Sequence, residues 1–199
     1  MGNQGGEIAR LREISRRLRG SRRLRPNNWT PEEVERRIVE EYVEWAYVFD
    51  ATGHQVMRKR GTEDGVSFTA DEVLVLKDAL LVHNHPPNRR FDDGDPRTEG
   101  GSFSDHDLDL VLTYDIAEIR AVTPGWRYVI VRPLRGWIPD ADSAAAVYGE
   151  LLESVRSEDL EAIATGRMAS LEYATATQAH RVMERLAVWG RFSYRREEF

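Results

Sequence analysis

The chain alternates between short apolar runs and longer segments in which apolar residues recur at helical spacing. Apolar runs or strict alternation predict strands at residues 45–49, 54–60, 79–82, 117–123 and 126–132. Helical spacing predicts helices that begin near residues 30, 69, 105 and 142, and a further helix over 176–188. Because strands and helices interleave along the chain, the pattern predicts an α/β fold.

Capping patterns mark the starts of several predicted helices. A hydroxyl residue is followed three positions later by an acid in Thr30–Glu33, Thr69–Glu72 and Ser104–Asp107. We expect the first of these helices to run through Ile38 toward Tyr42. The second is expected to run to Lys77 and to cover the sheet.

Composition limits the classes of protein to which the chain can belong. It contains no cysteine, which excludes disulfide staples and zinc ribbons. The formal net charge of −6 hides a basic start, because residues 1–25 hold eight Arg against Glu7 and Glu13. The acidic remainder argues against general nucleic-acid binding. No apolar run approaches a membrane span and the start lacks a signal-peptide core, so we expect a soluble, cytoplasmic protein without membrane contact.

We divide the chain into a basic N-terminal arm (1–28), a core (29–135) and a C-terminal helical extension (136–199). A short amphipathic helix is predicted in the arm from the apolar positions Ile8, Leu11, Ile14 and Leu18. Nucleic-acid contact is expected only through this Arg-rich arm. The two helices predicted in the extension either pack against the core or join two chains as a homodimer.

Two histidines at the end of a predicted strand are the leading candidates for function. His83 and His85 follow the apolar run 79–82, and alternate side chains of a strand face the same side. Asp107 lies in the first turn of a later predicted helix. Catalytic zinc usually has three protein ligands and an open position for water. These three residues therefore predict a Zn²⁺ site.

Each part of this pattern also has an ordinary structural interpretation. A His-x-His pair at a strand end is more often a surface or structural pair than a metal site. Ser104 and Asp107 also read as a helix N-cap, which is compatible with metal ligation because a cap fixes Asp107 where the helix begins. Asp92, Asp93 and Asp95 lack the later glutamate of a calcium-binding EF-hand, which favours a solvated loop.

Hydrolysis needs a base and an oxyanion donor beside the metal. Ser104 is the candidate donor. Glu40, Glu41 and Glu44 are all near enough in sequence to be the base. Glu44 is favoured because it lies at the leading end of the predicted strand 45–49, from which it can reach the histidine strand. His106 is a candidate for substrate contact.

The candidates occur together in an order that resembles a known signature. The ordered set is Glu44, His83-x-His85-Pro86 and Ser104-x-x-Asp107, with similar segments at Asp50–Gly53, Val66–Thr69 and Glu118–Pro124. It resembles the JAMM/MPN+ metallopeptidase family, in its bacterial and phage JAB-like branch, over about residues 44–132. One departure is the long polar, Gly-rich segment 88–103 between the second histidine and Asp107. We expect it to form a loop beside the metal that gates the site, grips a substrate tail or blocks access.

The resemblance implies a fold, an activity and a set of roles. The fold would be the three-layer, cytidine-deaminase-like JAMM core with a mixed sheet. The activity would be that of a zinc-dependent peptidase or isopeptidase that acts on a protein substrate, often next to the C-terminal tail of a ubiquitin-like protein. His83, His85 and Asp107 would be the ligands, Glu44 the base and Ser104 the oxyanion donor.

A second hypothesis is a non-catalytic JAB-like module that holds a phage structural protein or nucleic acid through the arm. RadC-like proteins share the His83-Asn84-His85-Pro86 motif and are associated with DNA. The joint presence of a base, an oxyanion donor and three ligands favours the enzyme, because a scaffold has no physical need for all of them.

Overall fold

The fold is built on a six-stranded mixed sheet. A computed structural model describes residues 29–199 except 89, 93 and 169, so the predicted arm lies outside the described residues. The strands are β1 (Trp45–Phe49), β2 (Gln55–Arg60), β3 (Leu80–Asn84), β4 (Glu118–Val122), β5 (Trp126–Val131) and β6 (Ser193–Glu198). Their order is β2-β1-β3-β4-β5-β6, with β3 and β4 parallel and every other neighbouring pair antiparallel. The predicted α/β class with a mixed sheet is therefore confirmed.

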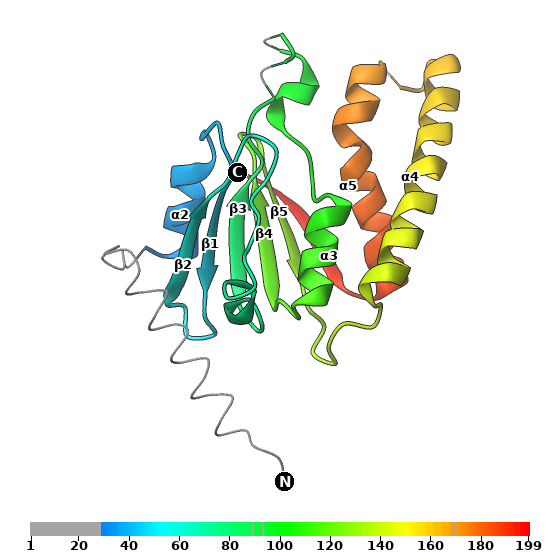
Figure 1. Cartoon of the computed structure of the whole chain (residues 1–199). Helices are drawn as coiled ribbons and strands as arrows, with labels where there is room; N and C mark the ends of the chain where they lie inside the picture. The colour runs from blue at the N-terminus through cyan, green and yellow to red at the C-terminus, as the bar shows by residue number, and fades with distance from the viewer. Residues whose placement is uncertain (1–28, 89, 93, 169) are drawn as a thin grey trace.

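Helices cover both faces of the sheet (Figure 1). One face carries α2 (Pro31–Ile38), and the other carries α3 (Asp105–Thr113), α4 (Ala141–Ala164) and α5 (Leu171–Gly190). Short 3-10 turns occur at Val73–Val75 and Pro96–Glu99. The long helices of the C-terminal extension pack onto the core, because Val155 and Leu186 share one buried cluster with Val48 and Ile119 of the sheet.

The alternation of side chains along β3 separates the two cores. Leu81 lies in the cluster beneath α3, α4 and α5, whereas Val82 lies in the cluster beneath α2. Residues two apart on a strand share a face. His83 therefore points to the same side as Leu81, toward α3, and Asn84 points toward α2. The period of the strand thus decides which face carries the candidate site.

The predicted helix over residues 69–77 is wrong, because the structure has only the 3-10 turn Val73–Val75 there. The capping contacts of Thr69 and Glu72 are present. The Glu72 carboxylate is also ion-paired to Lys59 of β2, and Asp78 has a positive φ of 58° that ends the turn. Tertiary contacts with the sheet therefore hold this segment in a tighter turn than its local pattern predicts.

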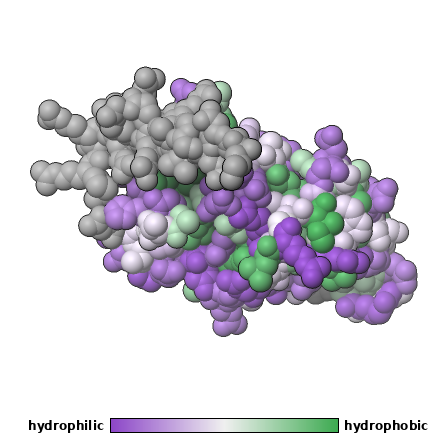
Figure 2. Space-filling view, turned by 90° about the horizontal axis from the view of Figure 1, so that it is seen from below, coloured by the Kyte–Doolittle hydropathy of each residue, from purple (hydrophilic) through white to green (hydrophobic). Residues whose placement is uncertain are grey.

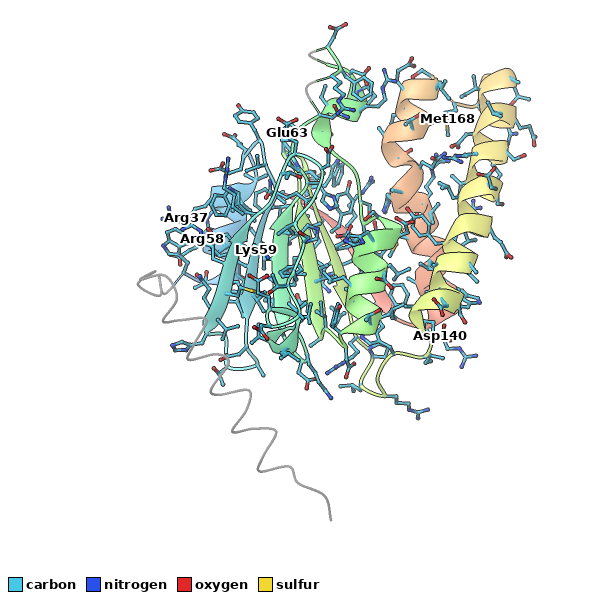
Figure 3. All side chains as sticks on the ribbon, viewed as in Figure 1. Arg37, Arg58, Lys59, Glu63, Asp140 and Met168 are labelled. Atoms are coloured by element: carbon cyan, nitrogen blue, oxygen red, sulfur yellow. The ribbon has the colours of Figure 1, made fainter. Side chains whose placement is uncertain are left out.

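The first helix is also shorter than predicted. It ends at Ile38 with Val39 as its C-cap instead of continuing toward Tyr42. Its last turn carries Arg37, which lies beside Arg58 of β2 at one edge of the molecule (Figure 3). The two guanidinium groups stack on Trp29 and Trp45, 4.1 and 4.4 Å from the ring centroids. Stacking on these rings anchors both cations at this edge.

Strand β6 was not anticipated, since the sequence analysis expected only helices in the extension. The segment Ser193–Glu198 is mostly polar and charged, so it carries no apolar alternation. Arg191 adopts a left-handed φ of 54°, which ends α5 and turns the chain back toward the sheet. The strand then pairs with β5 at the edge of the sheet. A charged edge strand is common because its outer side faces water.

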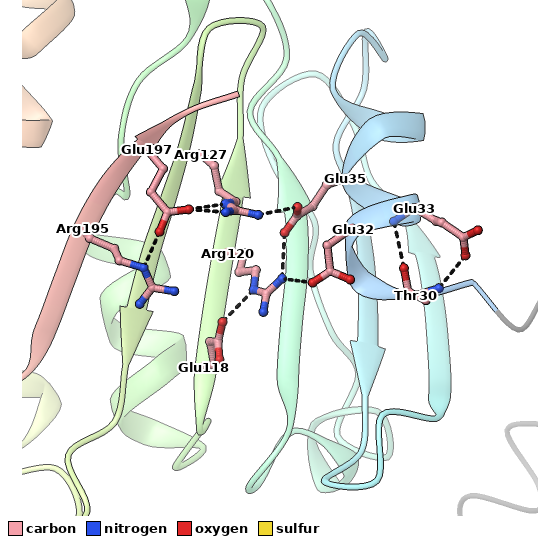
Figure 4. A network of polar contacts seen from close by, with 9 residues as sticks. All are labelled: Thr30, Glu32, Glu33, Glu35, Glu118, Arg120, Arg127, Arg195 and Glu197. Atoms are coloured by element: carbon pink, nitrogen blue, oxygen red, sulfur yellow. Dashed lines mark hydrogen bonds and ion pairs between the residues drawn. The ribbon is translucent and has the colours of Figure 1, made fainter.

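On the face of the sheet that carries α2, charged side chains connect this helix to three strands (Figure 4). Glu35 is only 1% exposed and accepts hydrogen bonds of 3.1 Å from both Arg120 and Arg127. Arg120 also pairs with Glu118, and Arg127 with Glu197 of β6. A buried carboxylate is tolerated only when it is paired in this way. The network therefore holds the short helix α2 against β4, β5 and β6.

The surface seen from below is mainly hydrophilic, with apolar side chains in separate patches (Figure 2). This agrees with a chain in which 31% of the residues are charged. Within the described part of the chain, no helix combines the length and the apolar character that crossing a bilayer requires.

Candidate metal centre

A cavity of about 370 Å³ lies where the end of β3 meets the start of α3. The loop 61–66 forms one wall, and its residue Glu63 is labelled near the end of the sheet in Figure 3. The lining residues are Glu44, Asp64, Gly65, Val66, Leu81, His83, His85, Ser102, Ser104, His106, Asp107 and Leu110. All five residues proposed from the sequence as ligands, base and oxyanion donor are therefore in one cavity.

His83, His85 and Asp107 form a group that could hold a metal ion. One potential ligand atom from each lies within 4.8 Å of the others. The Nε2 atom of His83 is 2.9 Å from that of His85 and 3.3 Å from Asp107 Oδ1, and His85 Nε2 is 3.6 Å from Asp107 Oδ2. Two ligands at about 2.0–2.1 Å from a tetrahedral zinc ion lie about 3.3 Å apart. The three side chains are thus already close to the spacing of a zinc site.

Small neighbours make room for His83. In the sheet register His83 lies opposite Ala46 of β1 on one side and Ala121 of β4 on the other. Paired residues of neighbouring strands share a face, and a methyl group on each side leaves space for the imidazole ring. Asp107 comes from α3, whose first turn the capping box of Ser104 holds in place.

The two histidines differ in the hydrogen-bond partner of Nδ1, the ring nitrogen that faces away from the centre. His85 Nδ1 is 2.7 Å from the carbonyl oxygen of Gly101, which leaves Nε2 free to face Asp107. His83 is 2% exposed, and its buried Nδ1 has no hydrogen-bond partner among the described residues. Metal-bound histidines usually donate their second N–H to such a partner. The orientation of His83 therefore depends on packing, and that of His85 on a hydrogen bond.

The charges of the three groups support one another. Burial alone would raise the pKa of Asp107, but the charges and hydrogen bonds of His83 and His85 hold it well below its usual range. Burial alone would lower the pKa of His85, but the hydrogen bond and charge of Asp107, with a further contribution from Glu44, raise it to about 9. The centre thus favours a positive charge beside Asp107, either a proton or a metal cation.

Metal affinity should therefore fall as the pH is lowered. Because the pKa of His85 is raised to about 9, a metal ion that binds Nε2 below this pH must displace a proton. We expect the apparent affinity to drop about tenfold per pH unit below that value and to level off above it. Titration with Zn²⁺ in competition with a chelator between pH 6 and pH 10 measures this. An affinity that stays constant between pH 7 and pH 9 would contradict the assigned proton.

The structure distinguishes the three glutamates. Glu44 lines the cavity, whereas Glu41 is exposed and outside it, and Glu40 lines a different pocket. The backbone of Glu44 pairs with loop 61–66, donating to Thr62 O and accepting from Gly61 N at 2.7 Å each. Of the three glutamates, Glu44 is thus the one that lines the same cavity as the histidines.

Asn84 helps to hold that glutamate. Its side chain faces away from the centre, accepts from Trp45 N at 2.8 Å and donates to Val43 O at 3.1 Å. It is fully buried. The residue between the two histidines therefore fixes the backbone on both sides of Glu44, although the sequence analysis assigned no role to it.

Ser104 also lies in the cavity, but its hydroxyl group is occupied. Its Oγ lies 2.8 Å from Asp107 Oδ2, and it accepts from Asp107 N at 3.2 Å. The helix-cap interpretation is therefore confirmed, and the same residue also lines the cavity. To act as an oxyanion donor, the hydroxyl must turn from Asp107 to the substrate. His106 is a further residue of the cavity wall.

No family model, curated protein or solved structure matches this chain. The case for a function therefore depends on the residues of the cavity and on their geometry. That geometry combines two imidazoles, a carboxylate ligand, a second carboxylate and a hydroxyl group.

Sequence reasoning did not anticipate two contacts made by the loop that precedes α3. Residues 88–103 were expected to form a polar loop beside the metal, and at the end of this segment the Gly101 carbonyl contacts His85 and Ser102 lines the cavity. Gly100 has a φ of +79°, and a Cβ there would lie 3.1 Å from His85 O. The absence of a Cβ at Gly100 therefore allows the loop to approach His85 closely. A Gly-Gly pair before the ligand helix was the available signal.

Proposed function

We propose that the chain is a zinc-dependent peptidase or isopeptidase of the JAMM type. The observation that carries this proposal is the placement of Glu44 in the same cavity as the three convergent groups His83, His85 and Asp107. A base beside an ion with one open position is an arrangement that can hydrolyse an amide.

The donor set fits zinc better than magnesium or calcium. Two imidazole nitrogens and one carboxylate oxygen are typical ligands of catalytic zinc. Magnesium and calcium prefer sites made of oxygen ligands. Glu44 and Ser104 line the same cavity, which would hold the water and the substrate.

The roles of the individual residues follow from this arrangement. A bound zinc ion would polarise a carbonyl group and lower the pKa of a water molecule toward 7. The Glu44 carboxylate would accept the proton of that water and pass it to the leaving amine. The Ser104 hydroxyl would donate to the developing oxyanion, and Asp107 would keep the ligand helix in place. The substrate inferred from the JAMM resemblance is a peptide or isopeptide bond next to the tail of a ubiquitin-like protein.

Cleavage assays test this function. The zinc-loaded protein is incubated with a mixture of peptides and with isopeptide-linked ubiquitin-like conjugates, and mass spectrometry detects new amine and carboxyl ends. We expect cleavage that stops after treatment with a chelator and returns when Zn²⁺ is added back. Cleavage that persists in the zinc-free protein would exclude a metal-dependent mechanism.

A further inference from the structure

A row of polar side chains connects the C-terminal extension to the metal centre. The hydroxyl of Tyr194, in β6, is 2.8 Å from Ser102 Oγ and 2.7 Å from Nδ1 of His180, in α5. On its other side, His180 Nε2 is 3.5 Å from the carboxylate of Glu184. Ser102 is 6% exposed and lines the metal cavity. The row therefore runs from the outside of α5 to the wall of the cavity.

The row ends at Ser102, next to the Gly101 carbonyl group that orients the candidate ligand His85. Gly101, whose carbonyl oxygen is 2.7 Å from His85 Nδ1, directly precedes Ser102. For Nε2 of His85 to bind a metal, Nδ1 must carry the proton and donate it to this carbonyl. The position of the Gly101 carbonyl thus sets the direction in which His85 points.

The backbone at Gly101 must be held in place by contacts with other parts of the chain. Gly100 and Gly101 have no side chains through which they could be packed in place, and glycine is the residue that loses most conformational freedom when it is ordered. The polar side chain that follows them is Ser102, and its hydroxyl is hydrogen-bonded to Tyr194. The 3-10 turn Pro96–Glu99, earlier in the same loop, also contacts α5, and Figure 1 shows the loop beside this helix.

The donors and acceptors of the row can be arranged in one consistent direction. The Glu184 carboxylate favours a proton on His180 Nε2, which leaves Nδ1 to accept from Tyr194. Burial lowers the pKa of His180, and the charge of Arg196 adds to this, so the ring is neutral near pH 7. Tyr194 then accepts from Ser102. The Tyr194 hydroxyl thus donates one hydrogen bond and accepts one.

Aromatic packing gives a second connection to the same centre. The ring of Phe103 is fully buried, with its centroid 6.4 Å from that of Tyr194. The same ring lies 6.0 Å from His83 and 6.4 Å from His85. Tyr194 therefore contacts the surroundings of both histidines through its ring and through its hydroxyl.

We propose that Tyr194 is a positioning residue for the metal centre, which acts through Ser102 to fix the Gly101 carbonyl that orients His85. The C-terminal extension is then part of the functional unit. This inference rests on the proposed zinc site, but it assigns a role to a residue outside the JAMM-like segment.

Substitution of Tyr194 by Phe tests the proposal, because it removes the hydroxyl and keeps the ring against Phe103. We expect the affinity for Zn²⁺, measured by competition with a chelator, to fall about 10- to 100-fold, the usual effect of removing a residue that supports a metal ligand. The absorption spectrum of the Co²⁺-loaded variant should change as well, because it reports ligand geometry. Ser102→Ala should have the same effect, and the double variant should be no worse than either single one.

Tyr47→Phe is the matched control. Tyr47 is also a buried tyrosine, with the Arg58 guanidinium 5.7 Å from its ring centroid, but it lies on the α2 face of the sheet. It should lose thermal stability without losing zinc affinity. Wild-type affinity in Tyr194→Phe, or an equal loss of affinity in Tyr47→Phe, would overturn the positioning role while leaving the zinc site intact. A wild-type protein that takes up no zinc would overturn both this role and the proposed function.

Discussion

Replacement of His85 by alanine should abolish zinc binding, whereas the wild-type protein should hold about one zinc ion per chain. His85 contributes one of three convergent ligand atoms, and its Nε2 lies 2.9 Å from that of His83. The two remaining ligands could not complete the usual set of three, and the vacated space would fill with water. Elemental analysis of the purified protein, after dialysis against zinc and removal of the excess, gives the stoichiometry directly.

His54→Ala is the control for this variant. His54 is an exposed residue that follows the turn between β1 and β2 and lies outside the metal cavity. It should keep the wild-type zinc content. Zinc retained by His85→Ala, or none bound by the wild-type protein, would remove the basis for a hydrolase. The second result would favour the non-catalytic binding module, which predicts salt-sensitive binding that is lost when residues 1–25 are removed.

Glu44→Gln should lower the turnover number about 10²- to 10⁴-fold while the zinc content remains that of the wild type. Glutamine has the size of glutamate and can keep its place beside loop 61–66, but it cannot accept a proton. Glu44 is not one of the three grouped ligands. The effect should therefore appear in the chemical step and not in metal binding. Cleavage rates and zinc content measured on the same preparation separate these two effects.

Glu41→Gln is the paired control, because Glu41 is exposed and lies outside the cavity. It should cleave substrate at the wild-type rate. If Glu41→Gln is inactive and Glu44→Gln is active, the base has been assigned to the wrong glutamate. If both are fully active, the proton is accepted by another group, of which Asp64 is the remaining acidic candidate in the cavity wall.

Sequence reasoning succeeded where the physical cause is local. The period of β3 places His83 on the face of Leu81, and this could be predicted because alternation is a property of the strand itself. The capping box at Ser104 and Asp107 could also be predicted, because its hydrogen bonds join residues three positions apart. The same reasoning failed at 69–77, where the capping contacts form but the segment is a 3-10 turn with an ion pair to β2.

The choice of the base in the metal centre shows what local sequence patterns cannot predict. The sequence named His83, His85 and Asp107, but it left three glutamates open as the base. That choice depends on pairing between residue 44 and loop 61–66, and on Asn84, whose partners lie about forty positions earlier in the chain. Contacts of this kind join distant segments and have no signature in spacing. The contribution of Ser102 and Tyr194, which are 92 residues apart, is of the same kind.

The sequence by itself determined the class of the fold, the faces of its main strands and helices, and the chemical identity of the candidate ligands, because each follows from residue type and short-range periodicity. Only the tertiary structure decided the order of the strands, the addition of β6, the position of Glu44 and the support of His85 by the loop before α3. These depend on which distant surfaces pack together, and that is settled by the burial of the whole chain.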